Sequence, residues 1–335
     1  MNKMLEEGCS AKSLNAKIYK LKELISGPKI KASEPMCIND PVTGELITDT
    51  ETIKKVSLEH NVKILTKYPI RKEDLKERKA KEEYHQKIMK KKDKDSLSLT
   101  RDVFDKVLEK IKEKGKKMFN SLNKAGDKYK DAIFKYMKRI FDNEEIPTQF
   151  SETTLIAIWK GKGSPLDLNM SRFIHEKAWP ARLCDAIVTE IMKPAIVESC
   201  PKIQIGGIPG SQSSENLITL KTWMMMKETN KENGIFQVLD MAKFFDKESL
   251  KDAMHTLSTK AKVDDKLYRL WWSLNENTRI SVRTSVGKSD SRVVEDSLGQ
   301  GSFGAALVST INIGHAVVDT FKDWLFGIEF LDPPR

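Results

Sequence analysis

An aspartate that ends a strongly apolar run is the residue of this chain with the clearest potential for chemistry. The run is Ile235-Phe236-Gln237-Val238-Leu239, and Asp240 follows it directly. Such a run is typical of a strand that is buried inside a sheet. A carboxylate at the end of a buried strand is costly unless a cation or hydrogen-bond donors meet it, and hard divalent cations prefer carboxylate oxygens. Asp240 is therefore a candidate metal ligand, and the alternative is an aspartate that caps the following helix.

A turn with two glycines around a glutamine is the second candidate. It reads Leu298-Gly299-Gln300-Gly301-Ser302. Glycine lets the backbone approach a flat or charged ligand closely, and the glutamine amide can hydrogen-bond the edge of a base or sugar. Taken alone, the pattern is also that of an ordinary turn before the apolar helix expected from Ala305 to Val318.

Together the two features resemble motifs A and B of the reverse transcriptase family of non-LTR retrotransposons. The order is the same: a strand that ends in D-x-x-x-x-F-D, here Asp240 to Asp246, and later a G-Q-G turn that opens a helix. Upstream segments resemble the fingers of that family. They are Ile146-Pro147, the strand and turn from Leu155 to Gly163, the segment from Asp167 to Ile174, Lys177, and the segment from Gln204 to Ser211. The resemblance covers residues 146 to 335 and rests on the joint order of these motifs.

The resemblance implies a site for a deoxynucleoside triphosphate and two Mg²⁺ ions. Asp240 would bind metal through its carboxylate, and Met241 would do so through its carbonyl oxygen. The resemblance also implies which residues contact the nucleotide. Lys160 or Lys162, together with Arg172, would bind the triphosphate, and Phe245 would pack against the sugar and exclude a 2′ hydroxyl. Gln300 and Gly301 would support the template–primer side. Asp246 is expected to be structural and to point away from the metals.

The chain departs from the family pattern at several positions. Phe244 stands where motif A has a small residue, Ala305-Ala306 stand where motif B continues with Ser-Pro, and Arg172-Phe173-Ile174 lacks the family's proline. Motif C, a hairpin with two adjacent aspartates, is expected just beyond Arg335. Asp240 alone cannot hold two metals in register. We therefore expect a fragment of an RNA-directed DNA polymerase that is truncated before motif C and inactive in nucleotidyl transfer.

The charge of the chain favours a polyanionic partner. Its 335 residues include 58 Lys+Arg against 48 Asp+Glu, so that the net charge is +10 and the pI is near 9.2. Neutralised phosphates release condensed counterions, which favours binding of an RNA template or an RNA–DNA hybrid. A solvated Lys/Glu surface is the alternative. A non-catalytic RNA-binding remnant and a basic helical scaffold protein also remain open as functions.

The cysteines and the hydropathy exclude other classes. The four cysteines form no C-x-x-C pair and do not have zinc-finger spacing with histidine, so a structural zinc is not expected. No segment approaches the roughly 18 apolar residues of a membrane helix, and the start carries no apolar secretion signal. We expect a soluble cytoplasmic or nuclear protein with no membrane partner.

The expected fold class is α+β, as the fingers and partial palm of a right-hand polymerase preceded by a basic helical region. Residues 1–145 are predicted to be this mainly helical connector, and the turn from Asn39 to Glu45 loosely resembles the connector of non-LTR elements. Residues 146–335 are predicted to be the partial polymerase domain. The apolar run ahead of Asp240 is expected at the centre of its sheet.

Local patterns predict the elements more closely. Apolar spacing predicts helices from a Thr100 N-cap through Ile111, over residues 128–142, around 183–191, and from a Ser214 cap through Met224, with Met224-Met225-Met226 as helix core and flank. Residues 153–159 are expected to be a strand, and residues 280–294 a hairpin that turns at 287–290. Residues 73–95 are either an exposed helix or partly disordered.

Overall fold

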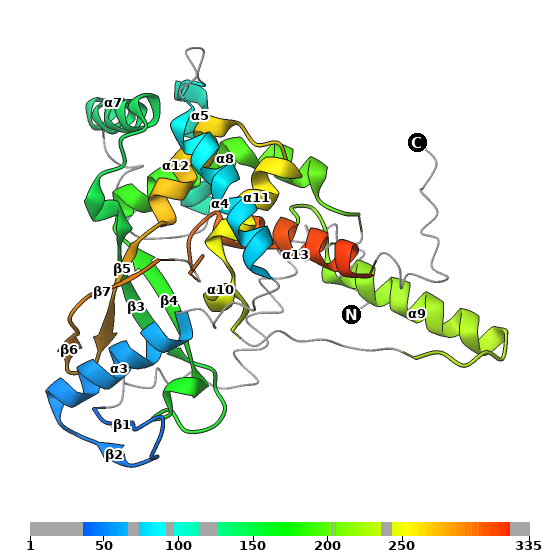
Figure 1. The fold of residues 1–335 in the computed structure, drawn as a ribbon, viewed down its shortest axis with the longest axis horizontal. Helices are drawn as coiled ribbons and strands as arrows, with labels where there is room; N and C mark the ends of the chain where they lie inside the picture. Colours follow the sequence, from blue (N-terminus) through cyan, green and yellow to red (C-terminus); the bar gives the residue numbers. More distant parts are fainter. Residues whose placement is uncertain are drawn as a thin grey trace, which may run out of the picture.

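The computed structural model describes residues 36–65, 74–91, 97–113, 126–202, 204, 206–235, 243–295, 297–299 and 301–321. The fold combines helices with a mixed sheet, which confirms the expected α+β class (Figure 1). The first predicted helices are present as α5 (Arg101–Glu113) and α7 (Asp127–Asn143). The Thr100 hydroxyl accepts a hydrogen bond from the Val103 backbone N–H at 3.4 Å, as expected of an N-cap.

Helices from both halves of the sequence surround one large hydrophobic core. Besides α5 and α7 they are α4 (Leu75–Lys90), α8 (Trp179–Ser199), α11 (Leu250–Thr259), α12 (Asp265–Asn275) and α13 (Ala305–Phe321). Phe104, Leu183 and Trp271 are fully buried in this helical core. Within the charged segment at 73–95, Leu75–Lys90 form α4, which is held to the core because its His85 Nδ1 lies 2.9 Å from the Tyr268 hydroxyl.

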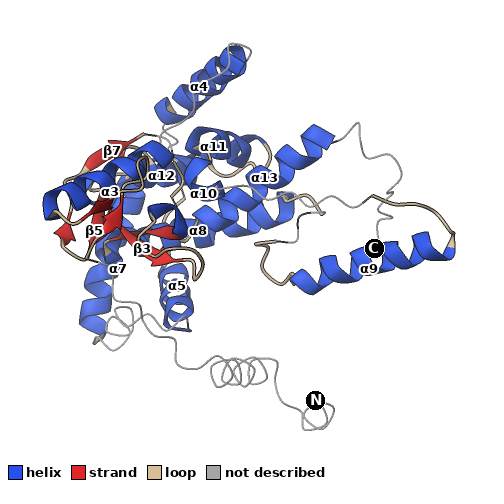
Figure 2. Ribbon diagram, turned by 90° about the horizontal axis from the view of Figure 1, so that it is seen from below, coloured by secondary structure: helices blue, strands red, loops and turns tan. Residues whose placement is uncertain are grey.

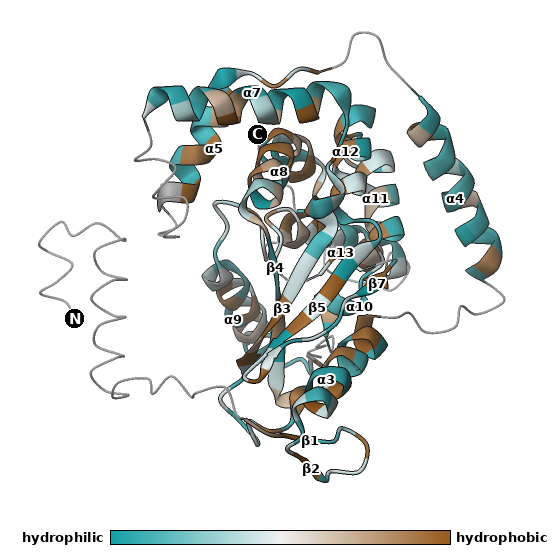
Figure 3. Cartoon of the chain, turned by 90° about the vertical axis from the view of Figure 1, so that its left-hand side faces the viewer, coloured by the Kyte–Doolittle hydropathy of each residue, from teal (hydrophilic) through white to brown (hydrophobic). Residues whose placement is uncertain are grey.

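A mixed sheet forms the second part of the fold. Its strands are β3 (Glu152–Trp159), β4 (Ser171–Lys177), β5 (Thr278–Thr284), β6 (Gly287–Lys288) and β7 (Arg292–Val294). The order is β4-β3-β5-β6, with β7 also paired to β5. Strand β3 runs antiparallel to β4 and parallel to β5. Figure 3 shows α3 (Thr50–Leu65) and the small ribbon of β1 (Ile38–Asn39) and β2 (Leu46–Ile47) at this end of the molecule.

A separate, smaller sheet core lies under α3. Leu155 and Ile280 of neighbouring strands are fully buried there, together with Ile53 of α3. Alternation explains this core, because residues two apart on a strand share one face of a sheet.

The hairpin after α12 is present, but its turn lies two residues earlier than predicted. Thr284 pairs with Gly287, so Ser285 and Val286 make the turn. The register then changes by one residue, because Arg283 lies opposite Lys288 whereas Ile280 lies opposite Arg292. The residues at 289–291 thus form a bulge, at a place where the sequence pattern predicted part of the turn.

Helix α9 (Ser213–Thr229) differs from its prediction in two ways. Its N-cap is Gln212, which forms a capping box with Glu215, and not Ser214. Met224, Met225 and Met226 are exposed and do not belong to a core. The reason is the position of the helix, which projects away from the helical core in two perpendicular views (Figures 1 and 2).

Of the predicted central strand, residues 235–239, only the first residue belongs to the described part of the chain. Ile235 is exposed and lies in a loop, while residues 236–242, including Asp240 and Met241, lie outside the described residues. Among the helices that the structure describes, none has the length and apolar character needed to cross a membrane.

Candidate nucleotide-binding site

The β3–β4 hairpin positions the three cations predicted to bind a triphosphate. Lys160 follows β3 and pairs back through its backbone N–H, which donates to the Met170 carbonyl at 2.8 Å. Gly161 makes the reversal with a positive φ of 75°, a conformation that L side chains rarely adopt. Lys162 is exposed in the turn, and Arg172 is exposed on β4, directly opposite Ile158. All three thus belong to one hairpin.

Asn169 of this hairpin holds two lysines that are far apart in the sequence. The Lys160 Nζ donates to the Asn169 backbone carbonyl at 2.7 Å. The Lys243 Nζ donates to the Asn169 side-chain oxygen at 3.3 Å. Burial and the neighbouring charge of Lys160 lower the pKa of Lys243. Lys243 also has a positive φ of 54°, so the backbone is constrained just where the segment after Asp240 meets the hairpin.

Asp246 lies within the influence of the same two lysines. It belongs to α10 (Phe244–Lys247), and its Oδ1 is buried and has no hydrogen-bond partner among the described residues. Burial raises the pKa of Asp246 to about 6, although Lys243 and Lys160 act in the opposite direction. At pH 7 a carboxyl group with this pKa is still mostly ionised, so Asp246 offsets part of the positive charge of the two lysines.

Helix α10 also contains the predicted sugar-binding residue. Phe245 is half-buried, and its ring centroid lies 5.3 Å from that of Phe244. The Ser297 hydroxyl donates to the Asp246 backbone carbonyl at 3.3 Å, which links α10 to the start of the G-Q-G turn. The segment that resembles motif A therefore contacts both the hairpin and the turn.

The glycines of the G-Q-G turn are explained by packing. Gly299 and Gly301 have positive φ values of 64° and 129°. A Cβ on Gly299 would lie 2.5 Å from the His175 Nδ1, and one on Gly301 would lie 2.8 Å from the His175 carbonyl oxygen. Both glycines are thus needed for close approach to β4. The glycine pattern predicted close approach to a ligand, whereas the described neighbour is strand β4. Gln300 lies outside the described residues.

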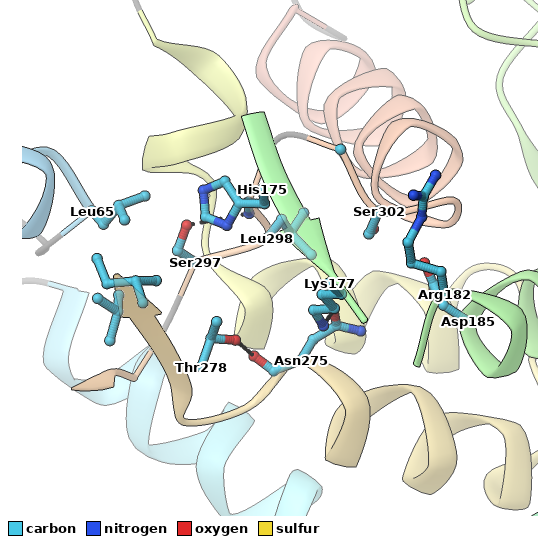
Figure 4. Close-up of a pocket in the computed structure, with 14 residues that line it drawn as sticks. Leu65, His175, Lys177, Arg182, Asp185, Asn275, Thr278, Ser297, Leu298 and Ser302 are labelled. Atoms are coloured by element: carbon cyan, nitrogen blue, oxygen red, sulfur yellow. Dashed lines mark hydrogen bonds between the residues drawn. The ribbon is translucent and has the colours of Figure 1, made fainter. Parts of the chain in front are cut away.

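A buried polar network lies behind this turn (Figure 4). Lys177 donates through Nζ to the Leu274 carbonyl at 2.6 Å and to the Asn275 Oδ1 at 3.0 Å. Asp185 accepts from the Trp271 Nε1 at 3.0 Å and from the Phe303 backbone N–H at 2.6 Å. Burial lowers the pKa of Lys177 and raises the pKa of Asp185.

Asp185 is a residue that sequence analysis missed. It is 2% exposed and interrupts the apolar stripe of α8, between Cys184 and Ala186. A charged residue inside an apolar stripe is the signal that could have drawn attention to it, because such a residue needs buried partners. Its bond to Phe303 fixes the chain just after the G-Q-G turn, so its role is to position that segment.

Metal ligands are not defined by the described residues. No group of three His, Cys, Asp or Glu side chains gathers as a metal site in that part of the chain. Asp246 lies at the described site, but Lys243 and Lys160 act on it, which favours an anion over a cation there. The metal-binding roles of Asp240 and Met241 therefore remain predictions. No protein-family model matches the chain, and no curated protein matches it either.

Proposed function

We propose that this chain is the fingers and part of the palm of an RNA-directed DNA polymerase of retrotransposon type. In this proposal Lys160 and Lys243 bind the phosphates of a deoxynucleoside triphosphate. The observation that carries it is the meeting of both lysines on Asn169, with Nζ contacts of 2.7 and 3.3 Å. The motif order alone resembles a polymerase, and this contact adds a concentration of positive charge at the point where two of the motifs converge.

The position of Lys243 relates the cluster to the predicted metal ligand. Lys243 is three residues after Asp240, so the two Cα atoms are separated by at most about 11 Å of extended chain. A bound triphosphate spanning that interval would contact the lysines at one end and the metal site at the other. Mg²⁺, when bound by Asp240 and the Met241 carbonyl, would help to hold the triphosphate, whereas nucleotidyl transfer needs a second metal and therefore further carboxylates.

The chain's own side chains would select and orient the nucleotide. Ammonium groups bind phosphate as point charges, and the Arg172 guanidinium can add a two-pronged contact. Phe245 would pack against the sugar and exclude a 2′ hydroxyl. Gln300 and Gly301 would support the template–primer side.

Equilibrium binding of dTTP in the presence of Mg²⁺ tests the proposal. Lys160→Gln and Lys243→Gln should each weaken binding about tenfold, the usual effect of losing one charge-assisted contact. Lys128→Gln, an exposed lysine of α7, is the matched control and should leave binding unchanged. Asp240→Asn should remove the dependence on Mg²⁺. Equal affinities for the wild type and for the Lys160 and Lys243 variants would refute the phosphate assignment.

A non-catalytic RNA-binding protein is the second candidate, and the net charge of +10 favours it. It predicts salt-sensitive RNA binding without measurable affinity for dTTP. A basic helical scaffold protein would bind neither. The same titrations, run with RNA and with dTTP, separate the three functions.

A further inference from the structure

A second positively charged feature lies along α3 and the strands β6 and β7. A groove of about 1060 Å³ runs between α3 and the strands β6 and β7. This volume is at the upper limit of small-molecule sites, which are mostly apolar. The groove has a different character, because its rim is formed largely by charged side chains and only its floor, with Leu58 and Val62, is apolar. An extended polar ligand fits it better than a small molecule.

Four exposed cations line both walls of the groove. Lys55 and Lys63 stand on α3, and Lys288 and Arg292 stand on β6 and β7. None of these four makes an ion pair with a carboxylate in the described part of the chain. A fifth cation, Lys54, pairs with Glu51 at 2.9 Å and packs its stem near Gly287. Lys54 is therefore part of the packing of the groove wall, whereas the other four side chains are available to a ligand.

The groove also contains carboxylates, which limit its charge. They are Glu51, Glu59 and Asp290, so the five cations exceed the three acids by two. Glu51 is already paired with Lys54. The four available cations thus face two acids, Glu59 and Asp290, and the groove keeps a net attraction for a polyanion.

The two lysines of α3 are far enough apart to contact different phosphates of one strand. Lys55 and Lys63 are eight residues apart on one helix, which corresponds to about 12 Å along its axis. That length equals the rise of between three and four nucleotides along one strand of a duplex. No aromatic side chain lines the groove within the described residues, so recognition by base stacking is not expected there. Contacts to the sugar–phosphate backbone of a nucleic acid do not depend on its base sequence.

We infer that the groove between α3 and β6–β7 binds the sugar–phosphate backbone of a nucleic-acid strand. The inference takes from the proposed function only that the partner is nucleic acid. It assigns this partner a surface that is separate from the Lys160–Asn169–Lys243 cluster.

The test measures binding of a 20-nucleotide RNA, and of its RNA–DNA hybrid, over a range of salt concentrations with the full chain. The groove variant combines Lys55→Gln, Lys63→Gln, Lys288→Gln and Arg292→Gln. The control variant has the same change in charge at exposed positions of α4 and α7, namely Lys76→Gln, Lys79→Gln, Lys128→Gln and Arg139→Gln. The groove variant should reduce the slope of log K against log salt by roughly 3, because each phosphate contact contributes about 0.7 to 0.9. The control variant should change it by less than about 1.

A second variant, which is expected to bind RNA more tightly, distinguishes a loss of RNA binding from a loss of folding. The variant Glu59→Gln with Asp290→Asn removes the two unpaired acids of the groove, and it should tighten RNA binding several-fold. Binding of dTTP is measured in parallel and should be the same for the groove variant and the wild type. If the groove and control variants reduce the salt slope equally, or the acid-removing variant binds no more tightly, the inference is wrong. A failure of dTTP binding in the wild type would instead count against the proposed function alone.

Discussion

The helical core and the sheet region treat buried charge differently. In the helical core two buried charges have firm partners: Arg269 contacts Glu144 at 2.6 and 3.0 Å, and Asp185 accepts two hydrogen bonds. At the candidate site beside the sheet, Asp246 keeps one buried oxygen without a described partner, while two lysines share Asn169. Partnered buried groups stabilise one arrangement of the chain, whereas a buried oxygen without a partner costs free energy that a bound ligand can recover.

The two regions also differ in the size of their hydrophobic cores, and the helical region again has the more stabilising arrangement. The helical core joins residues from α4 to α13, whereas the sheet core is confined to α3, β1 and a few strand positions. A larger continuous core buries more apolar surface per residue and is more stable. We therefore expect the helical region to be the rigid support and the sheet region to open more readily.

The largest effect is expected from Trp271→Ala in the helical core. Trp271 is fully buried and donates to Asp185, so its loss leaves both a cavity and an unpartnered carboxylate oxygen. The free energy of unfolding should fall by about 4 kcal/mol or more. Chemical denaturation measures it. Trp159→Ala, at a residue that is 41% exposed on β3, is the control and should cost less than about 1 kcal/mol. Comparable losses would contradict the comparison.

Leu155→Ala should have the next largest effect and act locally. Leu155 is fully buried in the sheet core, and its truncation should cost about 3 kcal/mol. Hydrogen exchange should accelerate in α3 and β3 while α8 and α12 stay protected. The matched variant Leu183→Ala removes an equally buried leucine from the helical core and should accelerate exchange throughout the molecule. Uniform acceleration by Leu155→Ala would show that the two cores unfold as one unit.

The pH dependence of stability distinguishes the candidate site from the rest of the fold. The pKa of Asp246 is raised from 3.8 to about 6. The folded state therefore binds the Asp246 carboxyl proton more tightly than the unfolded state does. The protonated carboxyl group contributes most to the free energy of unfolding below pH 3.8, and this contribution is lost as the pH rises through about 6. Across that interval the stability of the wild type relative to Asp246→Asn should fall by up to about 3 kcal/mol. Denaturation at several pH values measures it, and a flat difference would rule out the raised pKa.

For His60 of α3 the stability is expected to change with pH in the opposite direction. Burial and the nearby Lys243 lower its pKa from 6.5 to about 4. Its contribution is present above pH 6.5 and is lost as the pH falls towards 4. The stability of the wild type relative to His60→Gln should therefore rise with pH over the same range.

The smallest effect concerns two glycines with similar backbone angles. Gly161 and Gly299 have φ values of 75° and 64°, but only Gly299 lies against another side chain, that of His175. Gly161→Ala should cost about 1 kcal/mol through its backbone alone. Gly299→Ala should cost about 2 kcal/mol or more, because His175 must also move. Thermal unfolding of both variants decides it, and equal costs would mean that the turn is free to shift away from β4.

The sequence by itself determined the local elements with strong periodicity. The apolar spacing around Phe104 and Met137 predicted α5 and α7, because a helix needs one continuous apolar face and both residues lie on it. The β-rich run to Trp159 likewise predicted β3. Exposure of the α9 methionines was not predictable in this way, since composition does not say whether a neighbouring element covers a helix.

Only the tertiary structure brought the candidate site together. Lys243 and Asn169 are 74 positions apart, and their hydrogen bond depends on how α10 meets the β3–β4 hairpin. The reason for Gly299 likewise lies in the approach of His175 from another strand. Periodicity describes each segment against its own neighbours, whereas these contacts arise from the packing of segments that are distant in the sequence. The order of the motifs pointed to phosphate chemistry, and the docking of two loops decided which lysines lie where that chemistry is proposed.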